Sequence, residues 1–159
     1  MNMNDRFYVK AQTLCLSHFI STSVQPAVCE FSPGNLFVSY DHAVFYIIPE
    51  NKTLFDKSIY LSMAKIYPDK NFENMKQAIY PDAFQPVFLT GNVKNLTFGG
   101  TIVELKTNQN ELLWISGESL SPFPKKLKFL TSIDLSGPVF IYSALKTLLG
   151  GVYPVKANC

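Results

Sequence analysis

Charged side chains are scarce in one long segment of this chain, residues 11–48. The segment holds only Glu30 and Asp41, although the overall charged fraction is 16%. At that fraction, about six charges would be expected in a segment of this length. Residues 11–48 are therefore either buried on both faces or part of a surface that contacts another molecule.

Long hydrophobic runs are absent. The longest, residues 43–48 and 139–149, are much shorter than the roughly 20 residues that a membrane-spanning helix needs, and Lys146 interrupts the second. Residues 1–6 are polar and do not begin the basic, hydrophobic and small-residue order of a secretion signal. We therefore expect an intracellular protein without a transmembrane segment.

Cysteine content and net charge are both low. Three cysteines cannot all pair within one chain, and free thiols in a reducing compartment behave as small buried hydrophobes, so we expect no structural disulfide. A formal net charge of +2 gives no broad field that would attract a polyanion. Nucleic-acid binding would therefore need a local basic patch.

Apolar and aromatic side chains are abundant instead. The 159 residues are 47% apolar and 14% aromatic, which suits one large core, an interface, or both. We therefore expect one globular domain over residues 1–159. The sequence contains no Gly-rich phosphate loop, no Gly-x-Ser-x-Gly elbow and no His-Glu-x-x-His motif. It favours a non-enzymatic protein and indicates no cofactor.

The pattern of residues 6–49 is typical of β-structure. Apolar residues alternate with other residues over positions 7–12. Ser-Pro-Gly-Asn at residues 32–35 is a turn sequence. We expect residues 36–40 and 43–48 to pair as a hairpin after this turn.

Residues 50–82 hold ten charged side chains and predict two amphipathic helices. The first is expected at residues 53–66, where Thr53 can cap the helix and apolar residues recur at helical spacing. The second is expected at residues 69–79 and ends before a proline. Each helix has a solvated charged face.

The pattern of residues 85–117 predicts an antiparallel meander. Gly91-Asn92 suits a tight hairpin turn between two strands, whereas Gly99-Gly100 permits a bulge or sharp bend. The same reasoning predicts further strands at residues 101–106, 112–116 and 127–135.

An apolar helix is predicted at residues 138–149, because Ser136 suits its N-terminal cap and Gly150 its C-terminal end. Apolar residues extend nearly all round it, which is typical of a buried helix. Together these patterns predict an α+β fold. It is a largely antiparallel β-sheet or partly open barrel with a central pair of amphipathic helices and an apolar C-terminal helix.

Four side chains suited to metal binding or nucleophilic chemistry fall in residues 11–48, namely Cys15, His18, Cys29 and His42. Two thiolates and two imidazoles form a reasonable zinc shell, and an imidazole can activate a thiol. The spacing favours neither, since Cys15 and His18 point to opposite faces of a strand and Cys29 and His42 lack close-spaced partners. A small enzyme or metal-binding protein is an alternative, with no metal assigned.

A basic patch supplies a further alternative. Lys125, Lys126 and Lys128 lie beside Phe123 and Phe129, so a nucleic acid could meet cations and stacking platforms together. Lysines at alternate strand positions also keep an edge strand from pairing with another chain. The edge-strand interpretation is favoured, and nucleic acid is the less favoured partner.

These observations favour a non-enzymatic interaction or assembly protein that uses an apolar, aromatic-rich surface. The expected partner is another protein or a second copy of this chain. The candidate anchors come from residues 11–48 and 138–149, and they are Phe37, Phe45, Tyr46, Phe140 and Tyr142.

Overall fold

The computed structural model describes residues 3–23, 27–40, 44–54, 56, 84–97, 99–132, 135 and 137–155. The chain divides into two compact units: Met1–Tyr80 with Pro122–Pro124, and Pro81–Ser121 with Lys125–Cys159. The single domain expected over residues 1–159 stays a prediction. Almost all of the two central helices predicted at residues 53–66 and 69–79 lies outside the described residues.

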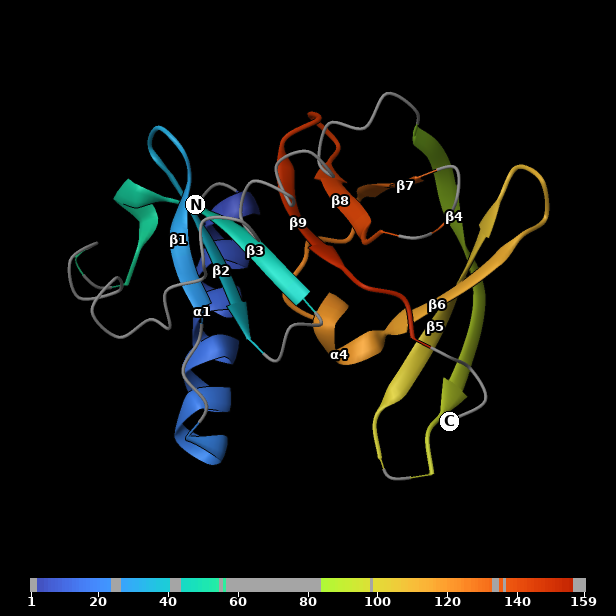
Figure 1. Ribbon diagram of the computed structural model, residues 1–159, viewed down its shortest axis with the longest axis horizontal. Coiled ribbons are helices and arrows are strands. Elements are labelled where there is room, and N and C mark those ends of the chain that lie inside the picture. Colours follow the sequence, from blue (N-terminus) through green and yellow to red (C-terminus); the bar gives the residue numbers. More distant parts are fainter. Residues whose placement is uncertain are drawn as a thin grey trace. The chain divides into compact units, whose positions relative to one another are not determined.

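In its described residues, the first unit combines the α-helix α1 with a three-stranded antiparallel sheet (Figure 1). Its elements in chain order are α1 (Met3–Thr22), β1 (Ala27–Ser32), β2 (Asn35–Tyr40), β3 (Val44–Pro49) and the short 3₁₀ helix η1 (Glu50–Lys52). Strand β2 lies between β1 and β3, and α1 packs against β2. The hairpin predicted from residues 36–40 and 43–48 is confirmed by the pairing of β2 with β3.

Helix α1 replaces the β-structure predicted for the start of the chain. Its buried side chains recur at helical spacing, and they are Phe7, Tyr8, Ala11, Gln12 and Cys15. Val9 is 46% exposed, so residues 7–11 do not alternate as a strand would. The prediction was wrong because apolar residues four apart fit both periods, and no proline or glycine interrupts residues 3–22.

An aromatic cluster packs α1 against the rest of its unit. The ring of Phe7 stacks on that of Phe123 with centroids 4.8 Å apart, and it meets the ring of Tyr46 edge-on at 5.8 Å. All three side chains are buried. Such pairs contribute roughly 0.5–1.5 kcal/mol beyond the burial of their area, so Phe123 is a core residue of the first unit.

A buried amide also ties α1 to the segment after β3. Gln12 Nε2 donates to the carbonyl oxygens of Tyr8 and Lys52, at 2.9 and 3.0 Å. Its Oε1 accepts from the amide of Leu54 at 2.9 Å. Lys52 also lies 3.3 Å from the Asp5 carboxylate. Because a buried amide needs such partners, Gln12 fixes how the helix and η1 meet.

The second unit contains a six-stranded antiparallel sheet in the order β9-β8-β7-β4-β5-β6. Its elements are β4 (Phe84–Asn95), β5 (Thr101–Thr107), β6 (Leu112–Ser116), the one-turn helix α4 (Gly117–Leu120), β7 (Leu127–Ser132), β8 (Val139–Ser143) and β9 (Leu148–Val152). Strands β5 and β6 confirm the strands predicted at residues 101–106 and 112–116, and β7 confirms residues 127–132 of the strand predicted at residues 127–135.

Strand β4 continues through the turn predicted at Gly91-Asn92. Leu89 pairs with Leu105 and Val93 with Val103, so three residues of β4 bulge opposite Glu104 alone. Gly91 has φ +91°, which glycine adopts without strain. The hairpin turn lies later, where the Leu96 amide donates to the Gly100 carbonyl at 3.0 Å. The turn and the bulge therefore exchange the positions predicted for them.

The apolar helix predicted at residues 138–149 is a β-hairpin. Strand β8 pairs with β9, and the Ser143 amide donates to the Thr147 carbonyl at 2.9 Å to close the turn. Lys146 in this turn has φ +66°. The prediction was wrong because an apolar run of this length fits a buried strand as well as a helix, and pairing with β7 favours the strand.

The antiparallel sheet of the α+β prediction is thus confirmed. The apolar C-terminal helix is not, and the described α-helices are α1 and α4. Within the described residues, no helix is long and apolar enough to cross a membrane.

Candidate functional site

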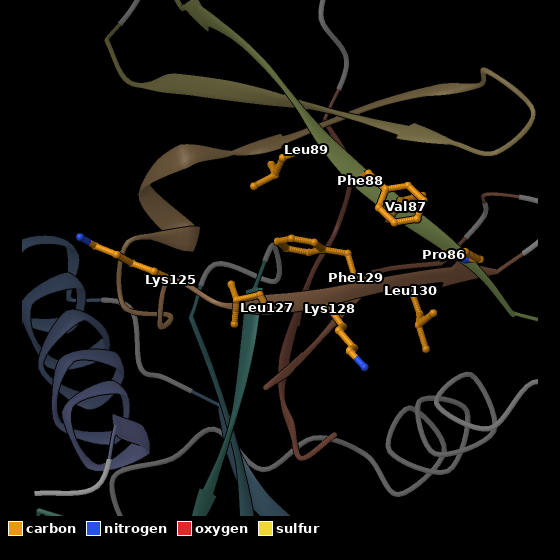
Figure 2. A pocket seen from close by; sticks show the side chains of 9 residues that line it. All are labelled: Pro86, Val87, Phe88, Leu89, Lys125, Leu127, Lys128, Phe129 and Leu130. Atoms are coloured by element: carbon orange, nitrogen blue, oxygen red, sulfur yellow. The ribbon is translucent and has the colours of Figure 1, made fainter. Parts of the chain in front are cut away.

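A fork opens in the sheet of the second unit between β4 and β7. The ladder between these strands ends at Val87 and Phe129. Beyond this pair β4 continues beside β5, while β7 pairs with β8 as far as Leu127 and Ser143. Figure 2 shows the two strands separating at this point. In this gap, the residues of β4 after Val87 and those of β7 before Phe129 no longer have each other as neighbours.

A cavity of about 440 Å³ occupies this fork, and we name it the fork groove. Seven apolar side chains and two lysines line it: Pro86, Val87, Phe88, Leu89, Lys125, Leu127, Lys128, Phe129 and Leu130. Its volume falls within the range of about 300–1,000 Å³ that is usual for small-molecule sites. No carboxylate is among these lining residues.

The lining residues divide between the two sides of the strands. Because strand side chains alternate, Leu127 and Phe129 share one side and Lys128 and Leu130 the other. Figure 2 shows Leu89, Leu127 and Phe129 around one space, with Lys125 extending from the end of it. Lys128 and Leu130 point the opposite way. One side of the groove is therefore apolar and ends in a single ammonium group.

The floor of the fork groove is core, whereas its β4 wall faces solvent. Val87 and Phe129 are buried, but Phe88 and Leu89 are 55% and 52% exposed. Lys125 and Lys128 are exposed as well. A ligand in the groove would cover apolar surface that water now contacts, and would meet positive charge.

The bulge of β4 ends the regular strand beside the groove. Glu104 is buried, and its Oε1 accepts from Thr90 Oγ1 at 2.8 Å and from Asn92 Nδ2 at 3.0 Å. Thr90 Oγ1 in turn accepts from the Asn92 amide at 3.2 Å. These bonds hold residues 90–92 in a fixed irregular conformation.

A second apolar surface continues from the groove across β4, β5 and β6. Phe88 pairs with Lys106 and Lys106 with Leu112, so the three side chains stand in one row. Val93 is exposed farther along β4. Leu89 and Val93 pair with Leu105 and Val103, so they face the opposite side of the sheet. We name the row of Phe88, Lys106 and Leu112 the ribbon patch.

The anchors predicted from the sequence lie in the interior of the chain, with one exception. Tyr142 is half-buried. The other four are buried: Phe37, Phe45, Tyr46 and Phe140. Phe37 stacks on Phe45 with centroids 5.0 Å apart, and Phe140 meets Phe84 edge-on at 5.5 Å. The ribbon patch offers more reachable surface than these four side chains do.

The Cys/His set is described only in part. Cys15 is buried on α1, and His18 follows three residues later on the same helix. This helical spacing replaces the strand on which the two residues would have pointed apart. The side chain of Cys29 and all of His42 lie outside the described part. Among described residues, no group of three or more His, Cys, Asp or Glu could hold a metal ion.

The three lysines of the basic patch are exposed, but the neighbouring aromatic rings are not. Phe123 and Phe129 are both buried, so neither presents a free face for a base. Lys128 stands on β7, which pairs with β4 on one side and β8 on the other. The edge-strand interpretation stays a prediction, because β7 pairs with β4 only from Phe129 to Ser132 and Lys128 lies beyond the end of that ladder.

The fork groove was not predicted from the sequence, although one signal points to it. Residues 86–89 read Pro-Val-Phe-Leu without a polar residue. In an antiparallel strand with one solvent-exposed face, apolar and polar residues would alternate. This run therefore indicates that both faces of β4 are apolar here.

No protein-family model matches the chain, and neither the curated proteins nor the solved structures give a significant match. Its function is therefore inferred from its own residues.

Proposed function

We propose that the protein is a non-enzymatic interaction or assembly protein and that the ribbon patch is the centre of its contact surface. One observation carries this proposal. Of the eight large hydrophobic side chains that are exposed in the described residues, Phe88 and Leu112 lie on one face of the sheet on either side of Lys106, and Leu89 and Val93 lie on the opposite face. The others are scattered: Val9, Ile20, Leu54 and Leu145. Clustering of this kind marks contact sites, whereas single exposed apolar residues are ordinary.

The apolar side chains of the patch supply the energy of such a contact. Burying the exposed half of Phe88 or Leu112 would contribute about 1 kcal/mol for each. These two residues flank Lys106 in one row, so a partner that covers both also meets an ammonium group. A carboxylate on the partner would complement that charge.

The charge of the row favours a different protein over a second copy of this chain. In a twofold contact between two copies, the same patch would face itself. Two Lys106 side chains would then approach each other, and like charges in an interface are unfavourable. A partner with an apolar and acidic surface avoids this repulsion.

The test uses the full chain as immobilised bait. A double variant, Phe88→Asp with Leu112→Asp, removes the apolar row and adds negative charge. Leu145→Asp is the matched control, because Leu145 is 90% exposed and lies outside the patch. We expect at least one protein to be retained by the wild type and by the control, and to be lost from the double variant.

The wild type, the double variant and the Leu145→Asp control are also compared by sedimentation velocity, which detects self-association. Self-association that only the double variant weakens would identify a second copy as the partner. The proposed function would be contradicted if the wild type is monomeric and if the immobilised wild type and double variant retain the same partner proteins. Thermal unfolding checks that all three proteins are folded.

A further inference from the structure

We propose that the fork groove binds a free fatty acid, with the acyl chain between β4 and β7 and the carboxylate beside Lys125. This site goes beyond the proposed function, because it takes a small molecule and shares only Phe88 with the ribbon patch.

The apolar side of the groove suits a flexible hydrocarbon chain. Leu89, Leu127 and Phe129 surround one space (Figure 2). Phe129 is buried beneath it, whereas Leu89 is half-exposed. A chain in this space would contact the core on one side and would remove Leu89 from water on the other. Both effects favour an apolar ligand over a polar one.

The charge at the end of this space selects a negative head group. Lys125 is exposed and extends from the groove beyond Leu127. Within the described part of the chain, no carboxylate lies at ion-pair distance from Lys125. A ligand carboxylate there would gain an ion pair while remaining partly hydrated.

The bulge makes an acyl chain a better occupant than an added β-strand. A strand that joins a sheet edge needs a regular row of backbone groups. Beyond Val87 the free edge of β4 is regular only for Phe88 and Leu89, since the bulge begins at Thr90. Bulges of this kind prevent edge pairing. A hydrocarbon chain needs no backbone partners.

The dimensions fit a single medium-length chain. The four residue steps from Lys125 to Phe129 span at most about 14 Å. The extended chain of laurate is of similar length. The cavity of about 440 Å³ is of a size that holds a small molecule.

Calorimetric titration of the full chain with laurate, below the concentration at which laurate forms micelles, tests the proposal. We expect saturable one-to-one binding. Lys125→Ala should weaken it about two- to fivefold, as for an exposed ion pair. Lys126→Ala should leave it unchanged, because Lys126 is an exposed neighbour that does not line the groove. Leu89→Ser should weaken it about tenfold by removing apolar contact.

Two further arms identify the charge and the source of the ligand. Dodecyltrimethylammonium has the same chain length with the opposite charge. It should bind at least about two- to fivefold more weakly than laurate. Phosphatidylglycerol vesicles present acyl chains only within a membrane, and the protein should not bind them. Amide NMR shifts caused by laurate should cluster at residues 87–89 and 127–130.

The proposal is overturned if laurate does not bind saturably, if Lys125→Ala and Lys126→Ala have equal effects, or if the shifts lie elsewhere. Binding to vesicles without binding to monomeric laurate would also overturn it, in favour of a membrane surface. Leu112→Asp separates this site from the proposed function. Leu112 does not line the groove, so this variant should bind laurate normally even where it loses a protein partner.

Discussion

Val87 and Phe129 form the last residue pair between β4 and β7, and both side chains are buried. The two residues that follow Val87 are half-exposed and apolar. Strand β4 therefore passes from core to surface within a single residue step, at the point where it leaves its neighbour. The fork groove and the ribbon patch both begin there.

Phe129 should contribute strongly to stability because it forms the floor of the fork. We expect Phe129→Ala to lower the free energy of unfolding by about 3–4 kcal/mol, through lost burial and the cavity left behind. Urea denaturation measures the change. Leu145→Ala is the control, since Leu145 is 90% exposed and should leave stability unchanged. A loss below about 1 kcal/mol for Phe129→Ala would mean that the fork is not closed by this residue.

The bulge of β4 should depend on the Glu104 carboxylate. Glu104→Ala removes the acceptor that Thr90 and Asn92 share, and we expect a loss of about 1–3 kcal/mol. Glu111→Ala changes an exposed carboxylate on the same ribbon and should have little effect. Chemical denaturation of both variants tests this, and equal losses would contradict the role given to Glu104.

The turn between β8 and β9 contains a strained residue that glycine should relieve. Lys146 has φ +66°, which costs a side-chain-bearing residue roughly 1–2 kcal/mol. Lys146→Gly should therefore raise the midpoint of thermal unfolding. Ala144→Gly in the same turn has no such strain to relieve and should lower it. A helix at residues 138–149 would reverse the first result, because glycine weakens a helix interior.

Phe123 should behave as a core residue and not as a platform for nucleic-acid bases. It is buried and stacks on Phe7, so Phe123→Ala should cost about 3–4 kcal/mol of stability. Filter binding to single-stranded RNA measures the alternative. A folded Phe123→Ala variant with unchanged stability and weakened, salt-sensitive RNA binding would contradict the structure-based assignment.

The strands that could be predicted were those bounded by strong turn signals. Residues 32–35 carry Pro, Gly and Asn and form a turn as expected, and the predicted hairpin of residues 36–40 and 43–48 follows it. Two other segments were assigned the wrong secondary structure for a different reason. Residues 7–11 and 138–149 are apolar at spacings that fit two periods, so the choice between helix and strand depends on packing against distant segments.

The candidate site could not be predicted because it arises from a tertiary relationship. The two walls of the fork groove come from residues 86–89 and 125–130, which are far apart in the sequence. Only their pairing at Val87 and Phe129, and the bulge that follows, create the gap. The sequence gives a partial signal in the unbroken apolar run of residues 86–89.

Hydroxyl-radical footprinting of the full chain tests most directly whether the ribbon patch is a contact surface. In dilute monomer we expect Phe88 and Leu112 to be oxidised nearly as readily as the control Leu145, and Phe45 to be protected, because only Phe45 is buried. In the complex with a retained partner, or in a self-associated form, Phe88 and Leu112 should become protected while Leu145 stays reactive. Protection of Phe88 and Leu112 in the dilute monomer, equal to that of Phe45, would contradict the account.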